Sequence, residues 1–145
     1  MVELEFVRTY DAPRRLVWEA WTDPDQIAQW WGPRGIRTPR ESIEIDLRPG
    51  GRMRFDMLDE ATGARYPNSG TIVDVDPPSR IVWSDDGFAD GSGKGTATVE
   101  FTEVDEHTTA LRVHIVADLS DTVRAGAEVG WGSQLDKLAE FLGER

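Results

Sequence analysis

Residues 120–142 read SDTVRAGAEVGWGSQLDKLAEFL, and this stretch decides the fold. One set of its apolar residues recurs at spacings of 4, 4, 4, 3 and 4, as expected for a helix of about 3.6 residues per turn with a single apolar face. These residues are Val123, Ala127, Trp131, Leu135, Leu138 and Leu142. A long helix with one apolar face has to lie on another apolar surface. The rest of the chain must supply that surface.

Between residues 35 and 118 the hydrophobic period changes to two, which is typical of half-buried strands. The strongest segment is residues 42–57. There, apolar and polar residues alternate up to the turn sequence RPGG at 48–51, and the alternation resumes with Met53, Phe55 and Met57. This pattern predicts a hairpin with one apolar face.

Further strands are expected on both sides of this hairpin. Alternation predicts them at residues 2–9, 65–75, 80–85 and 94–104, with a last strand returning after a turn at 105–107. Pro67 interrupts one of them, which predicts a sheet edge or a bulge at that point. Because short turns join consecutive strands, we expect the seven strands to form an antiparallel meander.

Two short helices should follow the first strand. The sequences DAP at 11–13 and TDP at 22–24 are helix start signals, since proline fits the first turn of a helix. Gly32-Pro33 ends the second helix. We therefore predict an α+β fold in which a curved, seven-stranded antiparallel sheet wraps around the C-terminal helix.

Composition excludes several classes of function. The 145 residues carry a net charge of −11 and no cluster of basic residues, which disfavours nucleic-acid binding. Cysteine is absent, so disulfides, thiol nucleophiles and cysteine-ligated zinc are excluded. No apolar run approaches the roughly 20 residues that cross a membrane. The N-terminus lacks the pattern of a secretory signal, so a cytoplasmic location and a single domain over residues 1–145 are expected.

No motif indicates a catalytic or metal site. The two histidines, His107 and His114, fall in a predicted turn and on the outer face of a predicted strand. Their spacing does not meet the requirements of a metal site. The glycines around Lys94 lie between two strands, which predicts a flexible loop at the mouth of a cavity and not a phosphate loop. We therefore predict no catalytic residue, no metal and no cofactor.

The apolar residues are the most informative part of the sequence. Six tryptophans occur, at 18, 21, 30, 31, 83 and 131, and they either close-pack a core or line a pocket. Gly126, Gly130 and Gly132 fall in the first half of the last helix, where each costs about 1 kcal/mol relative to alanine. They indicate either a close backbone approach to the sheet or a hinge that opens a cavity.

Several motifs together carry a family resemblance. They are Ala12-Pro13 followed by Val17-Trp18, Thr22-Asp23-Pro24, Trp30-Trp31-Gly32-Pro33, Leu47-Arg48-Pro49-Gly50-Gly51, Val75-Asp76-Pro77-Pro78-Ser79-Arg80-Ile81, and Gly130-Trp131 leading to Leu135 and Leu138. In this combination the chain resembles the START-like (SRPBCC, helix-grip) superfamily. Within it, the chain is most similar to the family homologous to the C-terminal domain of the activator of heat-shock protein 90 ATPase.

The resemblance implies a single START-like domain with a hydrophobic cavity between the sheet and the long helix. The matching positions expected to line or gate it are Trp31, Met53, Phe55, Trp83 and Trp131. The resemblance carries no catalytic residue over to this chain. The leading expectation is a monomer or homodimer that binds a small hydrophobic molecule, lipid-like or aromatic.

Two other functions stay open. One is an enzyme of cyclase or hydrolase type, with Tyr66, His114 or Asp56 as its acid or base. It requires an ionisable group that faces the cavity. The other is a co-chaperone-like interaction domain, which requires a partner interface above about 1,000 Å².

Overall fold

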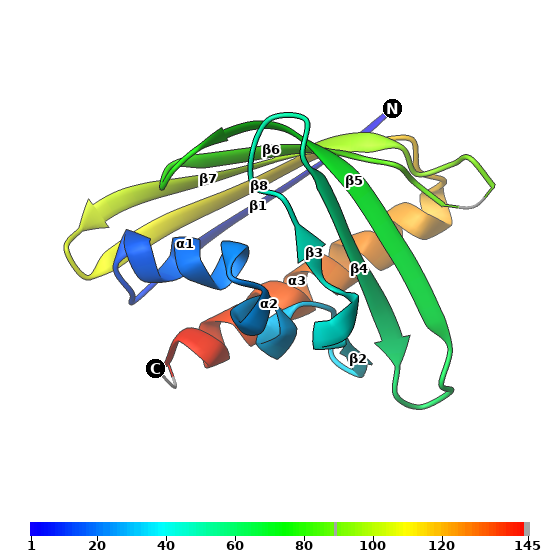
Figure 1. The fold of residues 1–145 in the computed structure, drawn as a ribbon, viewed down its shortest axis with the longest axis horizontal. Coiled ribbons are helices and arrows are strands. Elements are labelled where there is room, and N and C mark those ends of the chain that lie inside the picture. The colour runs from blue at the N-terminus through cyan, green and yellow to red at the C-terminus, as the bar shows by residue number, and fades with distance from the viewer. Residues whose placement is uncertain (89, 144–145) are drawn as a thin grey trace.

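A curved antiparallel sheet wraps around a long C-terminal helix in the computed structural model, which describes residues 1–88 and 90–143 (Figure 1). The strands are β1 (Val2–Tyr10), β2 (Ile36–Arg37), β3 (Glu44–Ile45), β4 (Arg52–Asp59), β5 (Arg65–Asp76), β6 (Arg80–Asp85), β7 (Gly95–Asp105) and β8 (Thr108–Ala117). The helices are α1 (Arg14–Thr22), α2 (Pro24–Trp30) and α3 (Asp121–Gly143), with a short 3₁₀ turn at Arg40–Ser42. The predicted α+β helix-grip fold is confirmed.

The sheet follows the predicted meander, with one short strand added at the β4 end. Its strand order is β1-β8-β7-β6-β5-β4-β2, with β3 also paired to β4. The first strand therefore lies beside the last, and all the pairs are antiparallel. The two-residue strand β2 is the addition that periodicity could not indicate, because two residues are too short to show an alternation.

The hairpin predicted at residues 42–57 forms, but its first strand is shorter than predicted: β3 spans only Glu44–Ile45, and Ser42 belongs to the 3₁₀ turn. Ile45 pairs with Met53 across β3 and β4. Glycine is required in the turn, because a Cβ at Gly51 would lie 2.0 Å from the backbone oxygen of Asp46. Gly50 supplies the positive φ of 83° that the reversal needs.

Pro67 lies at a free edge, as predicted. It pairs with Asp56 of β4 on one side, whereas β6 joins β5 only from Gly70 onward. The missing N–H of the proline therefore costs no ladder hydrogen bond on that side. The register shift in this strand lies further along, between Ile72 and Asp74.

The short helices close one end of the sheet (Figure 1). Their buried tryptophans fill this end with aromatic rings. Asp23 caps α2 by accepting a hydrogen bond from the Asp25 backbone N–H at 3.0 Å. Trp18 packs edge-on against Phe101 of β7 with ring centroids 5.1 Å apart. The tryptophans of α1 and α2 are thus mainly core residues.

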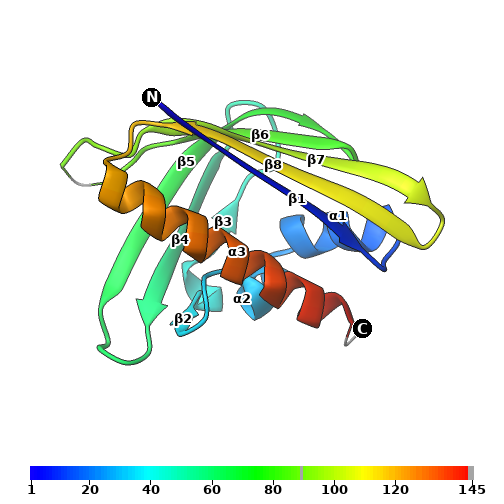
Figure 2. The same ribbon diagram turned by 180° about the vertical axis from the view of Figure 1, so that it is seen from behind.

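Helix α3 crosses the concave side of the sheet and is fixed by its second half (Figure 2). The Tyr10 hydroxyl donates to the Leu135 carbonyl at 3.0 Å, and the Lys137 ammonium donates to the Gly32 carbonyl at 2.8 Å. Burial raises the pKa of Tyr10, so its hydroxyl stays a donor, and burial lowers the pKa of Lys137. In the first half, Ala127 is the only residue among 121–129 that is not exposed.

Candidate functional site

A cavity in two lobes lies between the first half of α3 and the sheet. The larger lobe, about 440 Å³, opens toward β4, β5 and β6, and the smaller, about 170 Å³, toward β1, β7 and β8. Residues that line both lobes are Asn68, Trp83, Asp85, Phe88, Val123, Ala127 and Trp131. Since the two lobes share these residues, we treat them as one cavity.

Four of the five predicted site residues line the larger lobe together. They are Trp31, Phe55, Trp83 and Trp131. Met53 does not reach it and instead lines a small apolar recess of about 40 Å³. Trp31 and Phe55 border both spaces and meet edge-on, with ring centroids 5.4 Å apart. These two rings form a wall between Met53 and the side of the cavity covered by α3.

Trp131 is the centre of an aromatic cluster at the cavity. Its ring stacks on Trp21 at 6.3 Å and meets Trp31 edge-on at 5.7 Å. Phe6 of β1 stacks on it at 6.1 Å. Contacts on three sides fix the orientation of this half-buried ring, so the aromatic surface is formed before any ligand arrives.

The rim of the cavity exposes apolar side chains from two elements. Phe88, in the loop after β6, is 54% exposed, and Val123, near the start of α3, is 37% exposed. The loop predicted at the cavity mouth does lie there, because Gly87, Phe88 and Gly93 line the smaller lobe. Glycine suits position 93, because its φ is +81° and a Cβ on it would lie 2.7 Å from the Phe88 ring.

One ionisable side chain that sequence reasoning missed, Asp85, faces both lobes. It follows Ile81 and Trp83 at a spacing of two along β6, so alternation places it on the inner face. Burial raises the pKa of Asp85, and the charge of Asp86 raises it further, against the opposing effect of the hydrogen bond from the Gly87 N–H at 2.8 Å. In the sequence, its spacing of two residues from Trp83 is the signal that could have placed Asp85 on the cavity side of the strand.

Gln134 is another polar residue of the larger lobe, and the apolar stripe of α3 gave no sign of it. It is 3% exposed, and its Oε1 accepts a hydrogen bond from the Gly32 backbone N–H at 3.0 Å. Its Nε2, together with the indole N–H groups of Trp21 and Trp31, is buried without an acceptor among the described residues. Each such orphan donor costs about 1–3 kcal/mol, so the buried side of the cavity is not purely apolar.

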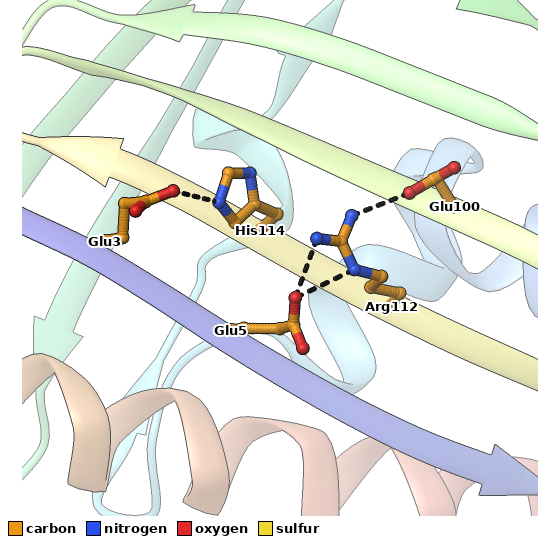
Figure 3. Close-up of polar contacts among 5 residues, drawn as sticks. All are labelled: Glu3, Glu5, Glu100, Arg112 and His114. Atoms are coloured by element: carbon orange, nitrogen blue, oxygen red, sulfur yellow. Dashed lines mark hydrogen bonds and ion pairs between the residues drawn. The ribbon is translucent and has the colours of Figure 1, made fainter.

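The three acid or base candidates predicted from the sequence lie outside the cavity. Tyr66 is 54% exposed, and Asp56 forms an ion pair with Arg65 at 2.8 Å. His114 points outward from β8 and meets Glu3 of β1 at 2.9 Å (Figure 3). Arg112, two residues earlier on the same outer face, bridges Glu5 and Glu100 (Figure 3). Strand alternation turns Asp56 and His114 away from α3. Tyr66 is on the inner face, opposite Met57, but it lies near the exposed start of β5 and lines neither lobe.

The outer face of the sheet around β1, β7 and β8 thus carries a row of ion pairs. Within residues 1–88 and 90–143, no group of three or more metal-ligating side chains comes together. Over the same residues, no helix is both long and apolar enough to cross a membrane.

A curved antiparallel sheet that grips one long helix over an apolar cavity defines the helix-grip, START-like class of proteins. The sequence matches the family described as Activator of Hsp90 ATPase homolog 1-like protein over residues 11–143. The chain belongs to this family. The resemblance seen in the sequence is therefore confirmed.

Solved structures support the same fold over nearly the whole chain. A protein from Nitrosomonas europaea is 25% identical with a TM-score of 0.84, covering 99% of this chain and 95% of its own. A protein from Chromobacterium violaceum is 23% identical with a TM-score of 0.84 and 98% coverage of both chains. The AHSA1 protein from Silicibacter pomeroyi is 23% identical with a TM-score of 0.82 and the same coverage. No functionally curated protein matches the chain.

Proposed function

We propose that this protein binds a small hydrophobic molecule in the cavity under the first half of α3. The observation that carries the proposal is the larger lobe itself, about 440 Å³ in volume and lined mainly by apolar and aromatic side chains. Pockets for small molecules typically have about 300–1,000 Å³ and this kind of lining. Trp31, Phe55, Trp83 and Trp131 are proposed as its contact residues.

Two further features support binding over simple core packing. The aromatic cluster around Trp131 holds its shape through ring contacts on three sides, so a ligand would meet a preformed surface. The rim exposes Phe88 and Val123, and apolar side chains at a rim can guide an apolar molecule inward. A core that was only packing would leave neither the cavity nor this rim.

The test begins with native mass spectrometry of the purified protein, followed by denaturation and identification of any released molecule. The neutral fluorophore N-phenylnaphthylamine is then titrated into the emptied protein. Ala127→Phe fills both lobes from the helix side and should weaken probe binding at least tenfold. Ala125→Phe, an exposed position of the same helix, should leave it unchanged.

The proposal fails under two results. One is a folded protein that releases no passenger and does not bind the probe. The other is an equal effect of the two phenylalanine variants, because binding would then take place outside the cavity. Circular dichroism and thermal melts of both variants show that the comparison is made between folded proteins.

The other two functions are less well supported. Asp85 is the one ionisable side chain lining the two lobes among the described residues, and none of the predicted acids or bases reaches them. A cyclase or hydrolase that needs an acid and a base would thus have a single candidate for both roles. A co-chaperone-like interface, a monomeric or dimeric state and a cytoplasmic location stay predictions.

A further inference from the structure

Asp85 holds an unusual position at the end of β6. One carboxylate oxygen accepts the Gly87 N–H at 2.8 Å, and within the described part of the chain the other has no assigned hydrogen bond. Its two cross-strand neighbours are Gly70 on β5 and Gly95 on β7. Glycine has no side chain, so neither neighbour covers the carboxylate. Asp85 itself is half-buried and lines both lobes of the cavity.

The packing of the strands explains why both neighbours are glycines. A Cβ at Gly70 would lie 2.4 Å from the Ser84 carbonyl oxygen, and one at Gly95 would lie 2.3 Å from the Val116 carbonyl oxygen. Neither position accepts a side chain without a shift of the backbone. The open space beside Asp85 is thus fixed by the sheet and does not depend on a side-chain rotamer.

The cavity supplies no positive charge to balance this carboxylate. No Lys, Arg or His lines either lobe among the described residues. The nearby Arg52 is engaged by Asp86 at 2.7 Å. Asp85 also borders an outer depression on the other side, which Met1 and Lys94 line with it, and there Lys94 helps to lower the pKa of Asp86. A carboxylate in mostly apolar surroundings gains most from a donor or a cation brought by a ligand.

We infer that Asp85 selects ligands with an apolar body and one hydrogen-bond donor group, and that a protonated amine is preferred. This inference rests on the proposed binding function. The apolar body would lie on Trp83 and Trp131, which line both lobes with Asp85. The amine or hydroxyl would donate to the free carboxylate oxygen. An anionic ligand of the same shape would be repelled.

A matched set of naphthalenes tests this order with one apolar body. Naphthylmethylamine is cationic, naphthylmethanol is a neutral donor, methylnaphthalene has no donor, and naphthylacetate is anionic. Equilibrium dialysis against the folded protein should give affinity falling in that order. The amine should bind about tenfold or more tightly than the hydrocarbon, as expected for a hydrogen bond to a charged group.

Asp85→Asn is the decisive variant, since its amide keeps an acceptor for the Gly87 N–H while removing the charge. In this variant the amine should lose its advantage over the alcohol, and methylnaphthalene should bind as before. Asp118→Asn is the matched control. It removes one charge at an exposed position beside Ala117 and Leu119 of the smaller lobe, and the order should persist.

The outcomes separate this inference from the proposed function. If all four compounds bind wild-type protein equally, the role of Asp85 is wrong and the binding function stands. If the amine preference survives in Asp85→Asn, it comes from the net charge of −11 and the inference is again wrong. If none of the four binds the folded protein, both fail. If Asp85→Asn does not fold, the two neutral compounds decide: naphthylmethanol should bind wild-type protein more tightly than methylnaphthalene, a difference that the net charge cannot cause, and equal binding overturns the inference.

Discussion

Replacing Gly126 by alanine should stabilise the folded protein. Gly126 lies inside α3, it is exposed, and a Cβ on it would meet no atom within 4 Å beyond the adjoining helix. The glycine therefore fills no steric need in the folded state. Alanine in a helix interior is favoured over glycine by about 1 kcal/mol, mainly because it restricts the unfolded chain.

The expected shift in melting temperature follows from the size of the chain. An unfolding entropy of about 2.1 cal/mol/K per residue, over 145 residues, gives about 0.3 kcal/mol/K. A gain of about 1 kcal/mol thus raises Tm by about 3 °C. Gly130→Ala should gain less, because its Cβ would lie 3.3 Å from the Pro33 side chain, which would have to move.

The assay is thermal unfolding of wild type, Gly126→Ala and Gly130→Ala, followed by circular dichroism and calorimetry at one protein concentration. Gly126→Ala should melt highest. If it melts at or below wild type, residue 126 is not helical in the folded state, and the cover of the cavity is not the helix described above. If the two variants shift Tm equally, the contact between position 130 and Pro33 does not restrict the helix.

The remaining predictions concern the polar groups of the cavity and the motion of its cover. Gln134→Leu should lower the free energy of unfolding by about 1–3 kcal/mol in urea titrations, although leucine suits the apolar stripe, because the buried Gly32 N–H loses its acceptor. A stability equal to wild type would contradict the role of that hydrogen bond. Burial raises the pKa of Asp85 in the folded protein, so the folded state binds the carboxyl proton more tightly than the unfolded state does. Wild-type protein therefore loses stability as the pH rises from the pKa of Asp85 in the unfolded state through its pKa in the folded state. The free energy of unfolding of Asp85→Asn minus that of wild type should therefore increase from acid to neutral pH, and a constant difference would count against a desolvated carboxyl. In hydrogen exchange, amides of residues 123–132 should exchange faster than those of 135–142, and equal protection would exclude a hinge in the first half of α3.

The fold could be predicted because its signals are local. The stripe in α3 and the alternation about the hairpin turn need only residues close in the chain, and Ile45 indeed faces Met53. The START-like resemblance then placed the cavity. Four of the five residues that the resemblance suggested line the larger lobe together. Met53 lies behind Trp31 and Phe55 and lines the small recess instead.

The polar groups of the cavity could not be predicted in the same way. Strand alternation places Asp85 beside Trp83, but the two glycines that uncover its carboxylate become its neighbours only through the register of three strands. Gln134 depends on the backbone N–H of Gly32, 102 residues away in the chain. Local periodicity has no information on contacts of this kind.

The two halves of α3 have separate physical tasks. The second half is anchored by two hydrogen bonds, from the Tyr10 hydroxyl to the Leu135 carbonyl and from the Lys137 ammonium to the Gly32 carbonyl. It also buries Leu135 and Leu138 in the core. The first half covers the cavity with Ala127 and exposes most of its other residues. Because the anchors belong to the second half, the first half can be weakened by glycine without loss of the fold. A cover of low local stability over a preformed aromatic surface is the arrangement by which a buried site can admit a ligand.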